Sequence, residues 1–311
     1  MVYTSLDNNG QYSLLTFPEL SLEVYEPLNL DTAFYDRVWS LSPDGRFMAF
    51  ERNSETRRLM LLDFQTGEMS ILADNNQSNG RPTWTADGRF LEFDNYNQGF
   101  TIYDTQTGNA RHIDTSSEFS DASAISPDGE RIAFKGGCPG LGIACPVDLY
   151  VINSDGSGEQ LLEKGAMDWI FWGQDSRLIY YSLFGDRETY GNSGELSDSG
   201  YRLHYFDLET GQSRSIEGWS FNTEAVDASY LSPNGEFLAY QFGFVGLKVV
   251  RASDYSLIDF VPGEYVAWSP DSRHLATNTW AGEWNLYDIQ TGQSASLDVD
   301  LQYSQIMGWL P

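Results

Sequence analysis

Four acidic side chains recur at one register of a repeated unit, and they are the residues best suited to chemistry or ligand binding. Each stands six residues before the position of a recurring proline: Asp121, Asp168, Asp227 and Glu264. Other copies carry Arg37, Gly80 and Gln305 there. Carboxylates held close together raise one another's pKa or recruit a cation. The pattern predicts a site for a divalent metal ion or a basic ligand group. The alternative is that each carboxylate accepts hydrogen bonds from loop amides.

The unit that sets this register is a strand-turn-strand hairpin. It is clearest at residues 41–50, Leu-Ser-Pro-Asp-Gly-Arg-Phe-Met-Ala-Phe, and it returns at 84–93, 125–134, 172–181, 231–240 and 268–277. Asp-Gly or Asn-Gly supplies the positive φ of a tight turn, and alternate apolar residues pack on neighbouring sheets. A second signature follows, as in Leu-Tyr-Asp-Ile-Gln-Thr-Gly at 286–292. It predicts a third strand that ends in a glycine turn to a fourth.

Four antiparallel strands at a spacing of about 40 residues predict one blade of a β-propeller. The hairpin and the third-strand signature resemble the repeat of the TolB-like (WD-like) β-propeller family. The resemblance implies an all-β fold, and we expect residues 1–311 to form a single propeller domain.

The two ends of the chain bear on the number of blades. Residues 306–311 look like an inner strand that stops before its turn, and residues 8–15 look like a turn that enters a second strand. Joined, they predict a seven-bladed propeller closed by N- and C-terminal strands in one blade. Six blades with an N-terminal extension are the alternative.

The loops differ between the two faces that a propeller presents. The turns after the first and third strands are short and uniform, whereas the loops on the opposite face are long and dissimilar, above all between Tyr181 and Tyr201. Variable loops on a rigid scaffold are where binding usually resides. Aromatic residues gather in them and offer stacking surfaces for a sugar or peptide: Tyr96, Tyr190, Trp219, Phe221, Phe242, Phe244 and Trp280. Packing of the loops on strand ends is the alternative role.

These features favour a non-catalytic scaffold that recognises a protein, peptide or glycan around the central channel. The alternative is a lyase or hydrolase acting on polysaccharide with two of the carboxylates as acid and base, with or without a metal ion. The sequence has no Gly-x-Ser-x-Gly motif and no phosphate-binding loop. His274 takes an apolar position of the hairpin, and no spacing links it to His112 or His204. We expect no cofactor, except a divalent cation at the channel mouth.

The charge of the chain limits its partners. There are 45 acidic against 18 basic residues and a net charge of −27, which repels nucleic acid and anionic membrane surfaces. Solubility alone is the alternative reason for this charge. No apolar run reaches the length of a membrane span, so no membrane insertion is expected. Nothing indicates the oligomeric state.

Two cysteines bear on the compartment. Cys138 and Cys145 lie in a segment rich in glycine and proline, with six residues between them. They form either a disulfide that staples the loop or two free thiols. Residues 1–7 lack the features of a signal peptide, so the chain is either cytoplasmic or the mature part of an exported protein. A disulfide favours the second, a periplasmic or secreted location.

Overall fold

The computed structural model divides the chain into two compact units, Met1–Ser78 with Tyr230–Pro311 and Asn79–Ser229. The residues that it describes are 2–5, 13–15, 22–24, 37–53, 56–74, 82–94, 99–116, 121–137, 148–165, 170–184, 201–216, 231–242, 246–263, 267–278, 283–297 and 305–309. Within these residues the regular secondary structure consists of β-strands, in agreement with the predicted all-β fold.

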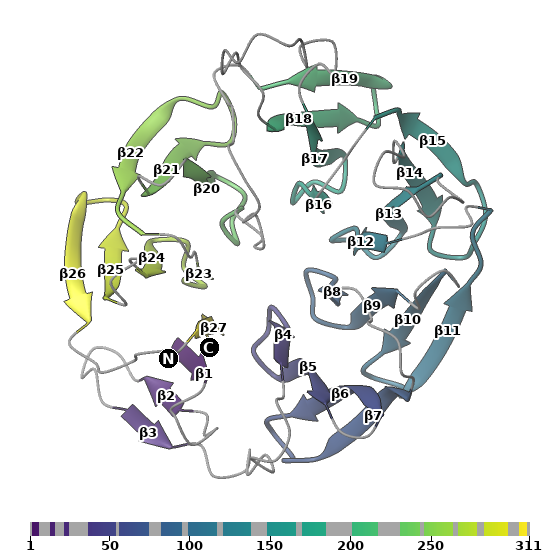
Figure 1. The fold of residues 1–311 in the computed structure, drawn as a ribbon, viewed down its shortest axis with the longest axis horizontal. Coiled ribbons are helices and arrows are strands. Elements are labelled where there is room, and N and C mark those ends of the chain that lie inside the picture. The colour runs from purple at the N-terminus through teal and green to yellow at the C-terminus, as the bar shows by residue number, and fades with distance from the viewer. Residues whose placement is uncertain are drawn as a thin grey trace, which may run out of the picture. The chain divides into compact units, whose positions relative to one another are not determined.

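The unit Asn79–Ser229 contains three four-stranded antiparallel sheets among its described residues (Figure 1). The first consists of β8 (Thr83–Trp84), β9 (Phe90–Asp94), β10 (Phe100–Asp104) and β11 (Asn109–Ile113). The second consists of β12 (Asp121–Ile125), β13 (Arg131–Gly136), β14 (Asp148–Asn153) and β15 (Gln160–Glu163). The third consists of β16 (Ile170–Trp172), β17 (Leu178–Phe184), β18 (Tyr201–Asp207) and β19 (Gln212–Ser215).

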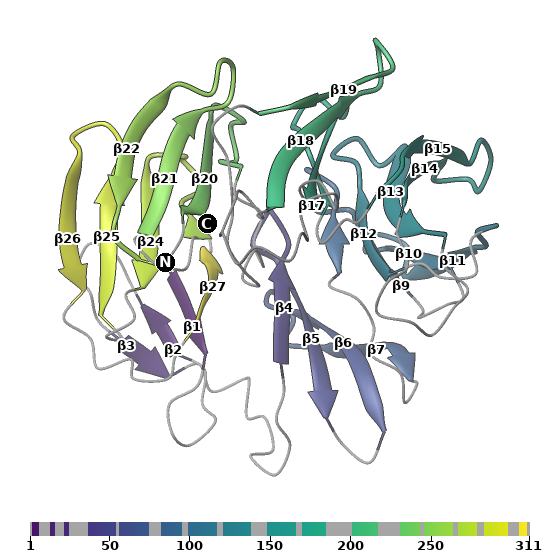
Figure 2. The ribbon, with the colours of Figure 1, turned by 45° about the horizontal axis from the view of Figure 1, so that its top comes forward.

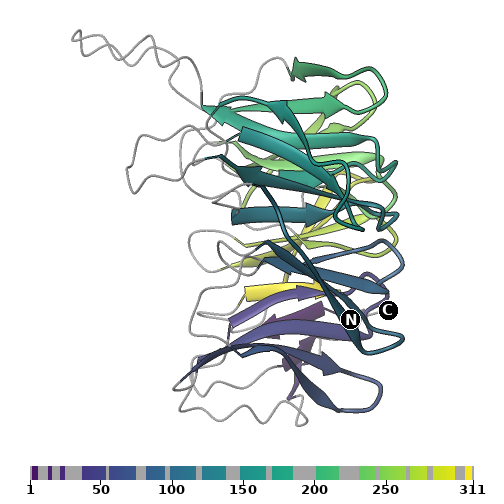
Figure 3. The same cartoon turned by 90° about the vertical axis from the view of Figure 1, so that its right-hand side faces the viewer.

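The other unit contains four sheets among its described residues. One consists of β4 (Arg37–Leu41), β5 (Phe47–Asn53), β6 (Arg57–Asp63) and β7 (Met69–Asp74). Another has three strands, β20 (Phe237–Phe242), β21 (Gly246–Arg251) and β22 (Leu257–Val261), with a single bridge between Leu231 and Leu238 beside β20. The next consists of β23 (Ala267–Trp268), β24 (His274–Asn278), β25 (Trp284–Asp288) and β26 (Gln293–Leu297). Figure 3 shows the strands of these sheets from the side.

The last sheet of this unit joins strands from far apart in the sequence. It consists of β1 (Val2–Ser5), β2 (Ser13–Leu15), β3 (Leu22–Val24) and β27 (Gln305–Trp309), in the order β27-β1-β2-β3. Strand β27 runs antiparallel to β1 (Figure 2). Val2 lies opposite Trp309, and Tyr3 lies opposite Gly308. The segment containing Trp309 therefore takes the place of the inner strand.

The repeated hairpins fold as the sequence predicts. In the first copy the Gly45 amide donates to the Ser42 carbonyl at 2.8 Å, and the Ser42 amide donates to the Phe47 carbonyl at 2.9 Å. The turn requires a positive φ at its fourth residue, which is 68° at Gly45. Glycine adopts this conformation without steric cost. Where the repeat has drifted, Ser176 and Ser272 adopt it with φ of 54° and 59°.

Apolar side chains from facing sheets form the core of the unit Asn79–Ser229. Phe100, Ile102 and Ile113 of the β8–β11 sheet pack on four residues of the β12–β15 sheet: Ile125, Ile132, Phe134 and Ile152. A second cluster joins Leu149 and Val151 to four residues of the β16–β19 sheet: Trp172, Ile179, Tyr181 and Phe206. The alternate apolar positions of the hairpin thus bury their side chains between sheets, as predicted.

The outer strands fall into two classes. In β7, β15 and β22 the register with the third strand shifts, and the extra residues are Leu72, Leu162 and Ile258. The residue before each shift is an exposed apolar one: Ile71, Leu161 and Leu257. The strands β11, β19 and β26 pair without a shift, and their described exposed side chains include no large apolar one. In chain order the two classes alternate.

The described residues include no helix long and apolar enough to cross a membrane. His274 lies in the second-strand position of its sheet, as the repeat predicts, and its side chain is about one quarter exposed.

Candidate functional site

Each sheet has two ends that differ in their chemistry. The end formed by the hairpin turn and by the turn between the third and fourth strands is called the turn end. We call the loop end the opposite one. Most of the long loops at the loop end lie outside the described residues, including 138–147 and 185–200.

A hydroxyl and a side-chain oxygen of aspartate or asparagine cap five of the described hairpins at the turn end. Ser126 Oγ donates to Asp128 Oδ1 at 2.6 Å and accepts from the Arg131 amide at 3.0 Å, and Asp128 Oδ1 also accepts from the Glu130 amide. The same arrangement recurs around Ser42, Thr85 and Ser269. Around Ser232 the amide oxygen of Asn234 takes the place of the carboxylate. The hydrogen bond from Thr85 lowers the pKa of Asp87. These carboxylates therefore satisfy the turn's own backbone.

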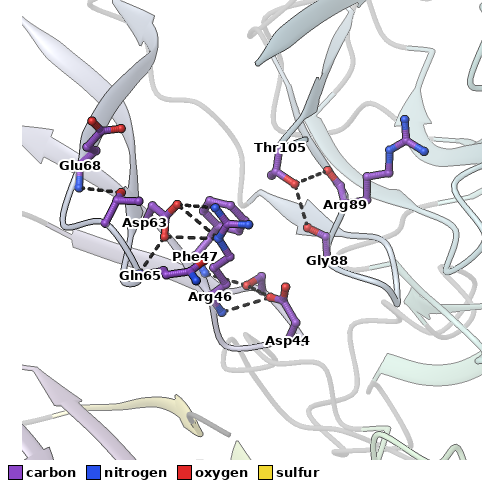
Figure 4. Close-up of polar contacts among 11 residues, drawn as sticks. Asp44, Arg46, Phe47, Asp63, Gln65, Glu68, Gly88, Arg89 and Thr105 are labelled. Carbon is purple, nitrogen blue, oxygen red and sulfur yellow. Dashed lines mark hydrogen bonds and ion pairs between the residues drawn. The ribbon is translucent and has the colours of Figure 1, made fainter. Parts of the chain in front are cut away.

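An arginine after the turn clamps the hairpin to the third strand. Arg46 Nη2 lies 2.8 Å from Asp63 Oδ2, and both side chains are visible in Figure 4. The equivalent pairs are Arg89–Asp104 at 2.9 Å, Arg177–Asp207 at 2.6 Å and Arg273–Asp288 at 2.6 Å. Hydrogen bonding from Arg273 holds the pKa of Asp288 at about 2. Each aspartate also accepts from the backbone of its own turn, as Asp63 does from the Gln65 amide.

The two serines at positive φ connect neighbouring sheets at the turn end. Ser176 Oγ accepts from the Asp128 amide at 3.1 Å, and Ser272 Oγ accepts from the Asn234 amide at 2.9 Å. The hairpin at 125–134 keeps glycine, Gly129, at this position. There the connection to the preceding sheet is a hydrogen bond from the Ala86 amide to the Pro127 carbonyl, at 2.9 Å. The hydroxyls, aspartates and arginines described above thus bond to one another, which makes the turn end a structural frame.

Three of the predicted ligand-binding residues fall on described strands, where only their backbones are defined. Arg37 is the first residue of β4, Asp121 the first of β12 and Phe242 the last of β20. The others lie outside the described residues: Asp168, Asp227, Glu264, Tyr96, Tyr190, Trp219 and Trp280. So do both cysteines, Cys138 and Cys145. Their roles remain predictions.

The register at the loop end pairs positions of opposite charge. Arg37 lies opposite Glu51, and Asp121 lies opposite Lys135. Glu51 and Lys135 are buried. Opposite charges at facing positions of an antiparallel pair are favourable. Gln305 also begins its strand, β27, so the alignment that defined the acidic register holds at three inner strands.

The loop end of the β4–β7 sheet concentrates arginines. Arg57 Nε lies 3.4 Å from Glu51 Oε1, and Arg58 Nε lies 3.0 Å from Asp74 Oδ1. The second oxygen of Glu51, Oε2, is buried without a hydrogen bond. Arg52, directly opposite Arg58, extends over the Phe50 ring at 5.5 Å. Among the described residues, no group of three or more His, Cys, Asp or Glu side chains is placed to hold a metal ion.

Sequence reasoning missed a buried carboxyl between two sheets. Glu92 of β9 is fully buried, with Oε2 2.8 Å from Thr83 Oγ1 in β8 and Oε1 2.7 Å from Ser123 Oγ in β12. The Ile125 amide donates to Thr83 Oγ1 at 2.9 Å. The signal was present in the repeat, because this hairpin position is alanine at Ala49, Ala133, Ala239 and Ala276. Burial raises the pKa of Glu92 to about 8.

Solved structures share this fold at low sequence identity. TolB from Acinetobacter baumannii matches with a TM-score of 0.54 and 13% identity, over 97% of this chain and 79% of that chain. An oligogalacturonate lyase in complex with manganese matches with a TM-score of 0.58 and 16% identity, over 89% and 81%. The Cps50 (Swd1) β-propeller domain of Myceliophteria thermophila matches with a TM-score of 0.57 and 14% identity, over 84% and 85%.

No family model matches the chain, and no curated protein sequence matches it. At identities of 13–16% the likeness concerns the fold alone.

Proposed function

The chain has a TolB-like β-propeller fold, and from this premise we propose that it is a non-catalytic scaffold that binds a protein, peptide or glycan at the loop end of its sheets. The observation that carries the proposal is the contrast between the two ends. At the turn end, a hydroxyl caps five of the described hairpins, and an arginine binds an aspartate in four of the described hairpins. At the loop end the repeat gives way to residues that differ from sheet to sheet, which is where a scaffold places recognition.

The proposed ligand group is basic. The acidic register provides Asp121, Asp168, Asp227 and Glu264, and the net charge of −27 attracts cationic partners over a longer range. The aromatic residues of the loops would stack on a sugar ring or an apolar side chain. A divalent cation held by the same carboxylates remains part of the proposal.

Peptide and glycan arrays test the proposal. The loop-end variant carries Asp121→Asn, Asp168→Asn, Asp227→Asn and Glu264→Gln. The control removes the same charge from exposed turn-end positions: Glu68→Gln, Glu130→Gln, Glu209→Gln and Glu236→Gln. We expect the loop-end variant to bind a ligand found with the wild type at least about tenfold more weakly, a loss of about 1.4 kcal/mol. Equal loss in both variants, or no ligand for the wild type, contradicts the proposal.

A second candidate function is cleavage of an acidic polysaccharide. It is supported by the similarity in fold to an oligogalacturonate lyase solved with manganese and by the acidic register. Incubation with polygalacturonate and Mn²⁺ tests it, with ultraviolet absorbance for unsaturated ends and a reducing-end assay for hydrolysis. Product that forms with the wild type and not with the loop-end variant would replace the scaffold proposal by the enzyme.

We further propose that residues 1–311 form one seven-bladed domain closed through the β1–β27 pair. Deleting residues 305–311 removes the inner strand of that sheet. Under the proposal the midpoint of thermal unfolding falls by at least about 10 °C or the protein fails to fold, because a strand edge is opened. A six-bladed propeller with an N-terminal extension predicts a change of no more than about 2 °C.

An extracytoplasmic location is also proposed, on the basis of the fold and of the spacing of Cys138 and Cys145. Alkylation of the unfolded protein with and without reductant, read by mass spectrometry, distinguishes a disulfide from two thiols. Two alkylated cysteines without reductant in protein taken from its native compartment would contradict it.

A further inference from the structure

We propose that Glu92 is a proton-dependent latch between the β8–β11 and β12–β15 sheets: the neutral carboxyl holds the inner strands β8 and β12 together, and its ionisation loosens them. The proposal does not depend on the binding function above. It concerns the unit Asn79–Ser229 alone, and it begins from a side chain that the repeat does not call for.

The latch is a short chain of hydrogen bonds across the seam between the two sheets. The Ile125 amide occupies one lone pair of Thr83 Oγ1, so the hydroxyl hydrogen of Thr83 is free to point at Glu92 Oε2. Ser123 Oγ lies on the other side, 2.7 Å from Oε1. A single carboxyl thus links β8 and β9 of one sheet to β12 of the next.

This geometry favours the neutral acid. Glu92 has no exposed surface, and neither of its hydrogen-bond partners is charged. An ionised carboxylate in such a place keeps most of its desolvation cost. Thr83 donates to Oε2 and Ser123 donates to Oε1, and these two hydrogen bonds lower the pKa of Glu92 by less than burial raises it.

Among the described residues, the charged groups around the seam add no counter-ion for an ionised Glu92. On its own strand Asp94 is buried, and its charge raises the pKa of Glu92 further. From β8 the facing residue is Thr83, and from β10 it is Ile102. Strand β12 carries one titratable position, Asp121, which is acidic. In β13, Phe134 lies opposite Ser123, so these two residues share one face of the sheet. Lys135 follows Phe134 in the chain and therefore belongs to the other face.

The sign of the pH dependence follows from the raised pKa. The pKa of Glu92 rises from an ordinary 4.5 to about 8 on folding, so the folded state takes up a proton between these values. The stabilising contribution is complete below 4.5 and is lost as the pH rises through about 8. Alkaline pH therefore opens the seam and frees β12, the strand that begins at Asp121.

Hydrogen exchange read by mass spectrometry tests the latch on the full chain. Peptides covering 82–94 and 121–126 are compared at pH 6.5 and pH 9.5, after correction for intrinsic exchange with an unfolded control. Between 4.5 and about 8 the opening equilibrium increases up to tenfold per pH unit, and more than one unit of this range lies above pH 6.5. We therefore expect opening of these peptides to increase at least about tenfold in the wild type. Glu92→Gln, which keeps the shape without the charge, should show no such increase.

Glu159→Gln is the matched control, because Glu159 also binds a serine hydroxyl and an amide, those of Ser116, but at the surface. It should keep the wild-type response. Alanine stands at this position in most other repeats, so Glu92→Ala provides a second pH-insensitive variant should the glutamine variant fail to fold. An unchanged wild-type opening between pH 6.5 and 9.5 overturns the proposal whatever the variants do. A response that is the same in the wild type and in a folded Glu92 variant also overturns it.

Discussion

The turn ends and the seam at Glu92 carry carboxyl groups in opposite ways. At the turn ends, Asp63, Asp104, Asp207 and Asp288 lie near the surface beside arginines. Their ionised form is the stable one. At the seam, Glu92 is fully buried between hydroxyls, and its neutral form is the stable one. The same functional group therefore ties strands together by charge in one place and by neutral hydrogen bonds in the other.

The stability of such a sheet protein depends differently on these two kinds of contact. A surface ion pair is screened by water and salt, so losing one costs little. A buried hydrogen bond that loses one partner leaves the other unsatisfied, at a cost of about 1–3 kcal/mol. Substitutions at the seam should therefore lower the free energy of unfolding more than substitutions at the turn ends. The stability should depend on alkaline pH at the seam and on acid pH at the turn ends.

Thr83→Val should have the largest effect. It removes the donor to Glu92 and the acceptor of the Ile125 amide without changing the shape of the side chain. We expect a loss of about 2–3 kcal/mol in the free energy of unfolding, measured in urea at pH 7. Thr105→Val is the control at a turn end, where Thr105 donates to the Arg89 carbonyl (Figure 4), and it should cost below about 1 kcal/mol. An equal loss of unfolding free energy in Thr83→Val and Thr105→Val would contradict the expected difference between the seam and the turn end.

Trp172→Phe tests a second seam, between β12 and β16. Trp172 Nε1 donates to the Ala124 carbonyl at 2.8 Å, and both residues are buried. Phenylalanine retains most of the packing but leaves the carbonyl unsatisfied, so we expect a loss of about 1–2 kcal/mol. The urea midpoint is the measurement, and this variant should keep the wild-type pH profile because no titratable group is involved. A loss confined to high pH would contradict this account.

Asp288→Asn tests the turn end at acid pH. The pKa of Asp288 is lowered from 3.8 to about 2 by the hydrogen bond from Arg273. The ion pair therefore stabilises the fold above pH 3.8, and this contribution is lost as the pH falls through about 2. Since the Arg273 side chain is 42% exposed, we expect at most about 1 kcal/mol after screening. The difference in stability between wild type and variant should shrink from pH 5 to pH 2, and a constant difference would count against the ion pair.

Arg46→Lys should have the smallest effect. Arg46 binds Asp63 through two nitrogens, Nε and Nη2, and lysine replaces this fork by a single ammonium. We expect a loss of about 0.5 kcal/mol in dilute buffer that nearly vanishes in molar salt. Chemical denaturation at two salt concentrations is the measurement. A loss as large as that of Thr83→Val would show that the turn-end clamps carry more stability than their exposure implies.

Periodicity made most of the framework predictable. The Asp44-Gly45 turn, the alternation of Phe47, Ala49 and their equivalents, and the third-strand turn each have a local physical cause that repeats six times. The drifted copies were correctly aligned as well, because Ser176 and Ser272 keep the turn geometry without glycine. Their hydrogen bonds to the neighbouring sheet were not predictable, since they depend on contacts far apart in sequence.

Less of the candidate site is specified by the local sequence. The register of Arg37 and Asp121 followed from the repeat, but the facing charges of Glu51 and Lys135 required the strand pairing. Glu92 stands where alanine recurs, and an acidic residue in one copy alone forms no periodic pattern. Its environment arises between two sheets, and no local pattern specifies it.

The shifted outer strands have a consequence for how copies of this protein behave together. An exposed strand edge with apolar side chains is a template for fibre formation, and Ile71, Leu161 and Leu257 supply such side chains. The extra residues Leu72, Leu162 and Ile258 interrupt the edge at those very places. A shifted edge cannot continue a regular ladder into a second copy. These three sheets therefore offer no continuous edge for polymerisation, even in a concentrated solution where salt screens the repulsion between the negatively charged chains.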